Sequence, residues 1–381
     1  MGGGMRKKLP MLIFILCFLL MLAIPLVGLL VQKETVSMEE NRRLAEPAVL
    51  VDDAGHVNPA FPVEFDAWVS DHVGFRKYLV LQSGQLHYAL FRKFPLGNPN
   101  VFGPSGELNF ATEVTFHDFQ HKDLYPEAYM QAVADALRVL SDYAEENGAR
   151  FYYYQCWDKQ SVYPEQFPDT LRQIGDESKT DLLVACYKDR GISVISPKET
   201  LIREKVNYET YSVFSDPNHW TQRGAYLGYL ELMDALNRDA AEPLRVLKEA
   251  DYKIKVKDQG YTLYGNIHRE NMLEEFKLRD PKAVLTNEKL SVGAAHPRSR
   301  YYTNPAVQNG KKLLIIGDSY FHESILDDIA ESFAETVLIW GDDAEQFKEA
   351  IAAYQPDIVV MENAEREDRT GLILSAASRL H

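Results

Sequence analysis

The chain has 381 residues, with 41 Lys and Arg against 56 Asp and Glu, which gives a formal net charge of −15. A chain this acidic lacks the basic face that a general nucleic-acid binder needs to displace counterions from phosphates. Apolar residues make up 46% and charged residues 25%, a globular composition that excludes wholesale disorder. The three cysteines are too few for a disulfide scaffold, and whether Cys156 pairs with Cys186 stays open at this stage.

The N-terminal segment has the composition of a membrane helix. Residues 9–31 (LPMLIFILCFLLMLAIPLVGLLV) contain no charged side chain and follow Arg6, Lys7 and Lys8. At ~1.5 Å per residue the run spans the ~30 Å hydrocarbon core. Its basic flank keeps the amino terminus in the cytoplasm. We expect residues 1–33 to be a cytoplasmic tip and signal anchor of a single-pass cell-membrane protein. The alternative is a cleaved signal peptide, whose apolar region is usually only ~7–15 residues.

Residues 34–105 are expected to form a stalk and a helical strap. Residues 34–60 are rich in charge, Pro and Gly and show no clear period. From Phe61 to Phe91 the apolar residues recur near helical spacing, with a break at Gly74, which predicts two short helices. Residues 101–110 have the pattern of two short strands around a Pro-Ser-Gly turn.

Residues 106–381 alternate helix and strand patterns, which indicates an α/β domain. The clearest predicted elements are helices over 129–146, 182–187, 226–237, 325–333 and 344–354, and strands over 151–154, 192–195, 313–316, 336–340 and 358–361. Apolar strands between amphipathic helices favour a parallel sheet covered on both faces. Residues 250–305 contain Lys-rich alternation, and we expect them to form an irregular, antiparallel insertion outside the wound core.

The sharpest local motif is residues 313–320 (LLIIGDSY), in which a buried strand runs through Gly-Asp-Ser into a helix. This pattern places Ser319 at the carboxyl end of a parallel strand, where α/β sheets hold their sites. The hydroxyl would lie beside free N–H groups that can receive a developing oxyanion. Helix capping by Asp318 and Ser319 is the competing interpretation, because both residue types are preferred N-caps.

A second cluster supplies a base. In residues 215–221 (SDPNHWT), Asp216 precedes His219 by three residues in a Pro-containing turn. Such a carboxylate can accept a hydrogen bond from imidazole Nδ1–H and leave Nε2 to take a proton from a serine. An isolated Asp-x-x-His is usually only a turn. Together with the Gly-Asp-Ser motif, however, it completes the residue types that nucleophilic acyl transfer requires.

These motifs together resemble the SGNH hydrolase superfamily, and within it the DHHW and AlgJ/AlgX-like branch of polysaccharide O-acetylation proteins. The likeness extends over most of the chain. It includes the anchor and residues 40–44 (ENRRL), 65–76 (FDAWVSDHVGFR), 103–108 (GPSGEL), 158–159 (DK), 162–165 (VYPE), 215–225 (SDPNHWTQRGA) and 356–366 (PDIVVMENAER). The resemblance implies a three-layer sandwich with a parallel central sheet. It also implies the permuted order in which Asp and His precede Ser.

The resemblance implies Ser319 as nucleophile, His219 as base and Asp216 as its orienting carboxylate. Pro217 and Asn218 separate Asp216 from His219, whereas the branch usually carries a closer Asp and His before the Trp. The backbone N–H of Ser319 is the safest oxyanion donor. Tyr320, Lys159 and Tyr163 are the further oxyanion or pocket candidates.

We expect neither a metal nor a cofactor. A zinc site needs three or four clustered ligands, and the chain has no C-x-x-C or similar His-rich spacing. Asp71, His72 and Arg76 could form a metal or anion site, but a surface turn tied by an Asp–Arg pair is the preferred interpretation.

The function that the resemblance implies is an extracytoplasmic, membrane-anchored O-acetyltransferase that acetylates a cell-surface or secreted polysaccharide through an acyl-serine. Because acetyl-CoA is cytoplasmic, the resemblance points to a multispan membrane O-acyltransferase as the partner that delivers the acetyl group. A carbohydrate acetylesterase would use the same triad with water as acceptor, and sequence does not separate the two. A non-catalytic glycan-binding or scaffold protein of an acetylation complex is the alternative from another class.

Overall fold

The computed structural model describes residues 3–31, 35–37, 42–51, 55–94, 99–238, 240 and 242–380. Glu40 and Asn41 of the motif at residues 40–44, and part of the stalk expected over 34–60, lie outside the described residues. The chain divides into two compact units. An N-terminal unit comprises Met1–Asn98 with Thr262–His268, and a main unit comprises Pro99–Tyr261 with Arg269–His381.

The main unit is built on a seven-stranded sheet with the order β11-β12-β14-β13-β15-β5-β6. The five strands from β14 to β6 are parallel, and β12 and β11 are antiparallel additions at one edge. The strands of this sheet are β5 (Arg150–Cys156), β6 (Val194–Ile195), β11 (Val284–Leu285), β12 (Arg300–Thr303), β13 (Lys312–Gly317), β14 (Glu335–Trp340) and β15 (Ile358–Ala364). Some neighbours in the sheet, such as β12 and β14 or β15 and β5, are not consecutive in the sequence, as crossover connections require.

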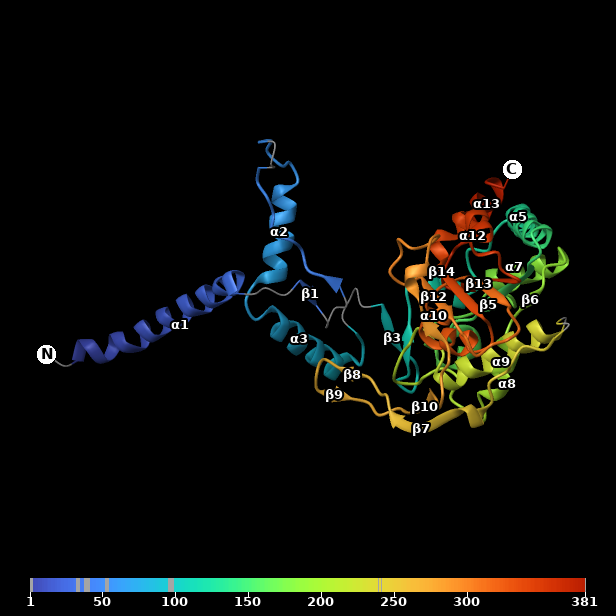
Figure 1. Cartoon of the computed structure of the whole chain (residues 1–381). Helices are drawn as coiled ribbons and strands as arrows, with labels where there is room; N and C mark the ends of the chain where they lie inside the picture. Colours follow the sequence, from blue (N-terminus) through green and yellow to red (C-terminus); the bar gives the residue numbers. More distant parts are fainter. Residues whose placement is uncertain are drawn as a thin grey trace. The chain divides into compact units, whose positions relative to one another are not determined.

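Helices cover both faces of this sheet, which makes three layers (Figure 1). One face packs on α5 (Glu127–Glu146), α7 (Lys179–Asp189), α12 (Phe347–Tyr354) and α13 (Thr370–Ser378). The other face packs on α8 (Lys198–Glu204), α9 (Gln222–Arg238), α10 (Ser319–Ser324) and α11 (Leu326–Ala330). The predicted α/β class with a parallel central sheet is confirmed.

Each central strand contributes alternate side chains to the cores on the two faces of the sheet. Tyr152 and Tyr154 of β5 belong to the core beneath α9, whereas Phe151 and Tyr153 belong to the core beneath α5. Successive side chains of a strand point to opposite faces, so an uninterrupted apolar run fits a sheet buried on both sides. The predicted strands and the long predicted helices fall on the observed elements.

The prediction for residues 250–305 is partly wrong. β7 (Tyr252–Asp258) and β10 (Met272–Leu278) do form an antiparallel pair outside the main sheet, as expected. β11 and β12, however, join the main sheet, where Tyr301 pairs with Val337 of β14. A four-residue strand containing polar side chains gives no local signal of this partner, because the edge position is set by tertiary pairing.

The remaining elements of the main unit are short. They are β3 (Asn100–Phe102) and β4 (Leu108–Phe110), which pair as predicted, with α4 (Glu113–Phe119), α6 (Lys159–Val162) and the 3₁₀ turns Pro164–Gln166, Glu249–Asp251, Asn287–Lys289 and Gly341–Gln346. The cysteines are free thiols, and Cys156 is buried in β5.

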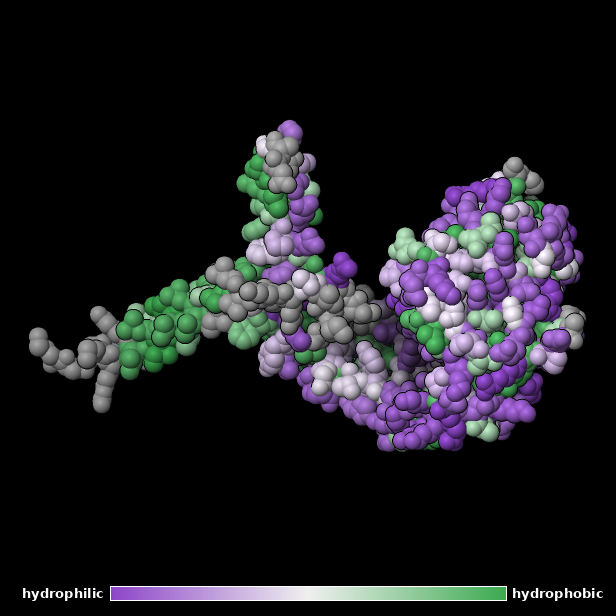
Figure 2. Space-filling model, in the orientation of Figure 1, coloured by the Kyte–Doolittle hydropathy of each residue, from purple (hydrophilic) through white to green (hydrophobic). Residues whose placement is uncertain are grey.

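The N-terminal unit contains α1 (Gly3–Val31), β1 (Val36–Ser37), β2 (Arg42–Arg43), α2 (Phe61–His72), α3 (Arg76–Phe91), β8 (Thr262–Leu263) and β9 (Ile267–His268). The two helices predicted on either side of Gly74 are confirmed, and Arg76 lies 3.7 Å from Asp71 as the Asp–Arg interpretation required. Within α1, Leu9–Val27 is long and apolar enough to cross a membrane. Figure 2 shows its coloured surface as almost uniformly hydrophobic.

Candidate active site

Ser319 is the first residue of α10, immediately after β13 ends at Gly317. Asp318 between them is the helix N-cap, and its Oδ1 accepts a hydrogen bond of 2.9 Å from Tyr320 N–H. Strand β13 is central in the sheet, between β14 and β15. Ser319 therefore lies at the carboxyl end of a central parallel strand, where this class of sheet places its sites.

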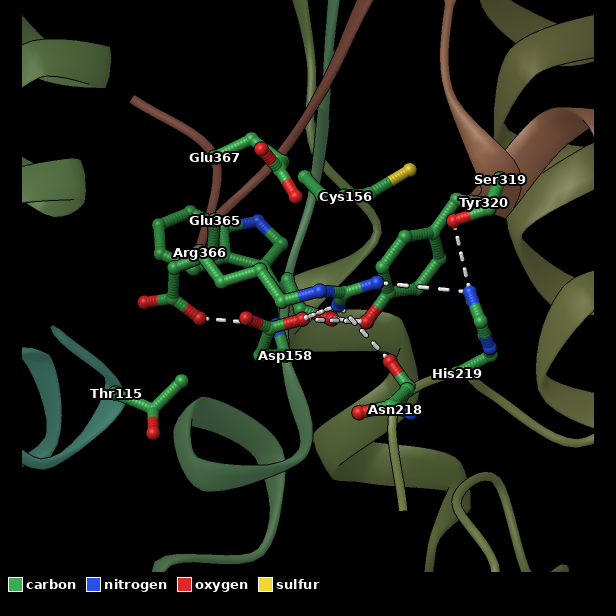
Figure 3. A network of polar contacts seen from close by, with 12 residues as sticks. Thr115, Cys156, Asp158, Asn218, His219, Ser319, Tyr320, Glu365, Arg366 and Glu367 are labelled. Carbon is green, nitrogen blue, oxygen red and sulfur yellow. Dashed lines mark hydrogen bonds and ion pairs between the residues drawn. The ribbon is translucent and has the colours of Figure 1, made fainter. Parts of the chain in front are cut away.

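The three residues singled out in the two motifs meet at this point. Oγ of Ser319 lies 2.9 Å from Nε2 of His219, and Nδ1 of the same ring lies 2.8 Å from Oδ2 of Asp216 (Figure 3 draws Ser319 and His219). With the proton on Nδ1, the ring donates to the carboxylate and Nε2 accepts from the serine hydroxyl. The His219 side chain is 17% exposed and that of Asp216 is 50% exposed.

The loop that carries Asp216 is held by its own hydrogen bonds. Oδ1 of Asp216 accepts from Asn218 N–H at 2.7 Å, and the Asp216 carbonyl accepts from Ser212 Oγ at 2.7 Å. Burial would raise the pKa of Asp216, but the hydrogen bonds from His219 and from backbone N–H groups outweigh it and hold the pKa below its usual value. Trp220 fastens the other end of the loop, because its Nε1–H donates to Ser324 Oγ at 2.8 Å.

A buried polar cluster supports the turn beneath Ser319. Oδ2 of Asp318 accepts from Arg369 Nη1 at 2.9 Å and from Ala364 N–H at 3.0 Å. Oε2 of Glu362, on the neighbouring strand β15, accepts from Asp318 N–H at 2.6 Å. Burial, and then the nearby Asp318 carboxylate, raise the pKa of Glu362 well above its usual range, while Arg369 opposes them. The raised pKa favours the neutral form of the Glu362 carboxyl, which lies beside the ion pair between Asp318 and Arg369.

A second network reaches His219 from the other side (Figure 3). Nη2 of Arg366 lies 3.5 Å from His219 Nε2, and Nη1 donates to the Asn218 carbonyl at 2.9 Å and to Asp158. The Asp158 carboxylate also lies 2.8 Å from the Tyr320 hydroxyl. The sequence marks Arg366 only through the resemblance over residues 356–366, because nothing local identifies an arginine 147 residues from a histidine as its neighbour.

Tyr320, predicted as an oxyanion or pocket residue, is fully buried. Its ring packs edge-on against His219 at a centroid distance of 5.2 Å, and its hydroxyl points to Asp158 and the Trp157 carbonyl. Its backbone N–H is used by Asp318. The backbone N–H of Ser319, by contrast, donates to no group in the described part of the chain, so it is available to an oxyanion.

Lys159 and Tyr163, the other two pocket candidates, lie inside the protein. Nζ of Lys159 donates to the carbonyls of Leu108 and Ser212, each at 2.8 Å. Burial lowers the pKa of Lys159 to about 7, with nearby acidic groups opposing the shift. The Tyr163 hydroxyl accepts from Thr210 N–H at 3.1 Å. Both side chains hold the segment that leads into the Asp216 loop, and the structure records no contact of either with the three site residues.

A cleft of the main unit lies at the C-terminal end of α10. It has a volume of about 540 Å³, and Glu323 and Ser324 of α10 line it. Its walls combine the aromatic rings of Tyr226, Phe276 and Tyr302 with carboxylates that include Asp328. Burial raises the pKa of Asp328 to about 7. In the described ranges, no group of three or more His, Cys, Asp or Glu side chains is arranged to hold a metal ion.

No protein-family model and no curated protein matches the sequence, whereas several solved structures match the fold. PatB1 of Bacillus cereus is 15% identical at a TM-score of 0.50, over 72% of this chain and 98% of that one. Its structure with a sulfonyl adduct gives the same identity and score over 66% and 94%. The O-acetyltransferase domain of Pseudomonas putida AlgJ is 14% identical at a TM-score of 0.48, over 74% and 99%. At such identities the PatB1 likeness shows a common fold, which agrees with the predicted three-layer α/β architecture with a parallel central sheet.

Proposed function

We propose that the protein is an extracytoplasmic, membrane-anchored O-acetyltransferase that transfers an acetyl group to a cell-surface or secreted polysaccharide. The observation that carries this proposal is the continuous chain of contacts from Ser319 Oγ through His219 to Asp216. A serine, an imidazole and a carboxylate joined in this order are the arrangement that activates a hydroxyl for acyl transfer. The acetyl group and the sugar acceptor come from the sequence resemblance to the O-acetylation branch.

In the first step, Ser319 Oγ attacks the carbonyl carbon of the acetyl donor while His219 Nε2 takes the serine proton. The Asp216 carboxylate keeps the proton on Nδ1 and stabilises the imidazolium that forms. The carbonyl oxygen becomes an oxyanion, which the free N–H of Ser319 can receive. Collapse of this intermediate breaks the bond to the donor, and the leaving group departs with the proton held on Nε2.

In the second step, an acceptor hydroxyl of the glycan reacts with the acetyl-serine. His219 Nε2 removes the hydroxyl proton, the sugar oxygen attacks the ester carbonyl, and a second oxyanion forms at the same N–H. Its collapse breaks the bond to Oγ and returns the proton to Ser319. The acetyl group ends on the sugar and the site returns to its starting state.

The donor side of the reaction follows from the proposed topology. If α1 anchors the chain with its main unit outside, acetyl-CoA in the cytoplasm is out of reach. We therefore propose that a multispan membrane O-acyltransferase passes acetyl groups across the bilayer to Ser319. The polysaccharide acceptor and this membrane protein would be the two partners of the main unit.

Two alternatives give different outcomes in one assay. An acetylesterase would form the same acetyl-serine but release only acetate. A non-catalytic scaffold would form none; a long Ser319–His219 distance would have favoured it, and the observed 2.9 Å removes that argument. The protein of the same fold that carries a sulfonyl adduct suggests a second probe, because sulfonyl reagents modify activated nucleophiles.

The test uses the full-length protein in detergent micelles with p-nitrophenyl acetate, with and without a panel of glycans. We expect mass spectrometry to find acetyl on Ser319 and, when the acceptor is present, on sugar. A sulfonyl fluoride should label the same residue, and Ser319→Ala should lose both adducts. Acetate without acetylated sugar would replace the transferase by the esterase. The absence of both adducts on Ser319 would overturn an enzymatic role for this site.

A further inference from the structure

Helix α3 of the N-terminal unit has one buried face, and that face is small. Gly84 and Tyr88 are its buried residues. A Cβ on Gly84 would lie 2.3 Å from the ring of Tyr264, at the tip of the β8–β9 hairpin, so the ring lies directly against the helix. Gln85 Nε2 donates to the Tyr264 carbonyl at 3.1 Å. The hairpin therefore occupies the side of α3 that a soluble helix would fill with large apolar residues.

The opposite face of α3 is apolar and exposed. Leu79, Leu86 and Leu90 are 59%, 62% and 64% exposed, and Phe75, just before the helix, is 59% exposed. At 100° per residue these four side chains fall within one narrow sector of the helix surface, opposite Gly84. Soluble proteins do not ordinarily leave such a stripe of leucines in water.

Phe75 adds a backbone observation. Its φ is +64°, in the left-handed region that a bulky side chain disfavours and that glycine adopts freely. The neighbouring residue is Gly74, yet the strained position is occupied by the aromatic ring. Backbone strain of this kind indicates that the side chain has a role that outweighs the cost of the strained conformation.

The charged side chains of the segment that carries α3 have one sign, although Arg76 lies 3.7 Å from the Asp71 carboxylate at the end of α2. Residues 73–94 contain Arg76, Lys77, Arg92 and Lys93 and no Asp or Glu, although the whole chain has a net charge of −15. Two of these cations lie at each end of the helix. An apolar stripe between basic ends is complementary to a bilayer that contains anionic phospholipid.

The corner between α2 and α3 touches the membrane-helix candidate. Gly74 N–H donates to the Pro25 carbonyl at 2.8 Å, and Pro25 lies near the C-terminal end of the apolar span Leu9–Val27. A helix that starts at this corner begins at the level where the span leaves the hydrocarbon. If α1 spans the bilayer, the exposed apolar stripe starts next to the lipid rather than in bulk solvent.

We propose that α3 is an interfacial membrane-binding helix, whose apolar stripe (Phe75, Leu79, Leu86 and Leu90) enters the outer leaflet while its basic ends contact anionic headgroups. This inference rests on the proposed membrane anchoring by α1. The N-terminal unit would then hold the bilayer at two places, by a span and by a helix lying along the surface.

The test reconstitutes the full chain into phosphatidylcholine vesicles with and without phosphatidylglycerol. A fluorophore is attached to a cysteine in Leu86→Cys, after Cys17→Ser and Cys186→Ser have removed the accessible thiols. Quenching by spin-labelled lipid is compared with quenching by aqueous iodide. The matched control is Ala132→Cys, an exposed position on α5 of the main unit. We expect the lipid-to-iodide ratio at Leu86 to exceed the control at least about twofold, and to rise with the anionic lipid.

Two further variants separate the possible failures. A label on native Cys17, within α1, reports the anchor alone, so an unquenched Cys17 overturns the anchor and this inference together. Iodide access to Leu86 while Cys17 stays in lipid would overturn only the interfacial helix. Shielding of Leu86 from both quenchers would also overturn it, since protein would then cover the stripe. Phe75→Gly relieves the backbone strain, so it should raise the melting temperature while lowering lipid quenching at Leu86.

Discussion

Nη2 of Arg366 lies 3.5 Å from Nε2 of His219, the nitrogen that also lies 2.9 Å from Ser319 Oγ. The Arg366 side chain is 13% exposed, and its charge is balanced by Asp158, whose side chain is 5% exposed. A compensated cation therefore adjoins the atoms that exchange a proton in the proposed reaction. Because Arg366 contacts both Asp158 and His219, its contributions to stability and to activity can be separated by mutation.

Arg366→Met should reduce both properties. It leaves Asp158 buried and unpaired, which typically costs about 3–5 kcal/mol, and it removes the contacts to His219 and the Asn218 carbonyl. Urea unfolding of the main unit measures the effect on stability, and the acetyl-transfer rate measures the effect on activity. The control is the double variant Asp158→Asn/Arg366→Met, which should regain most of the stability and little of the activity. Full recovery of activity in the double variant would limit Arg366 to a structural role.

The proposed reaction depends most directly on Ser319 and His219. Ser319→Ala and His219→Ala should each abolish acyl transfer with a melting temperature near that of the wild type, since neither side chain is part of the core. Asp216→Asn should lower the rate by about 10²–10⁴-fold, since the ring loses the carboxylate that fixes its tautomer. Ser378→Ala, at an exposed position of α13, is the control and should keep full activity. Either alanine variant that remained fully active would remove that residue from the mechanism.

Replacement of Glu362 by glutamine should change the stability little, whereas replacement by alanine should lower it. The protonated carboxyl and glutamine have nearly the same shape, and both offer an oxygen to Asp318 N–H, so Glu362→Gln should cost less than about 1 kcal/mol. Glu362→Ala leaves that N–H unpaired and opens a cavity, at a cost of about 2–4 kcal/mol. Equilibrium unfolding at pH 7 compares them. Equal losses in the two variants would show that Glu362 is ionised in the native protein.

Asp328 should make stability depend on pH. Its pKa rises from 3.8 to about 7 on folding, because burial disfavours the carboxylate. Below pH ~4 the group is protonated in both states; between pH ~4 and ~7 unfolding releases its proton, so its contribution to stability falls as pH rises. Asp328→Asn does not titrate. The difference in melting temperature between the variant and the wild type should therefore increase in the variant's favour from pH 4.5 to 7 and stay constant above pH 7. A difference that does not change with pH would contradict the raised pKa of Asp328.

Much of the fold was predictable because helix and strand patterns are local. The apolar run at residues 313–316 predicts a buried strand, and the period at 129–146 predicts helix α5, whatever lies next to either in space. The same holds for the chemistry of the two motifs, since Ser319 follows a strand and Asp216 precedes His219 within one turn. The partner of a short edge strand such as β12 was not predictable in this way, because its sequence carries no preference strong enough to identify it.

The sequence by itself thus determined the elements and the residue types that acyl transfer needs. The tertiary structure decided which of them meet: β13 lies between β14 and β15, and this order brings Ser319 to His219 across 100 residues of sequence. It also buried the side chains of Tyr320, Lys159 and Tyr163. In addition, it brought Glu362 and Arg369 into contact with Asp318. The physical reason is that periodicity encodes which side of an element is buried, whereas a contact between distant polar groups exists only once strand order and packing have set their positions.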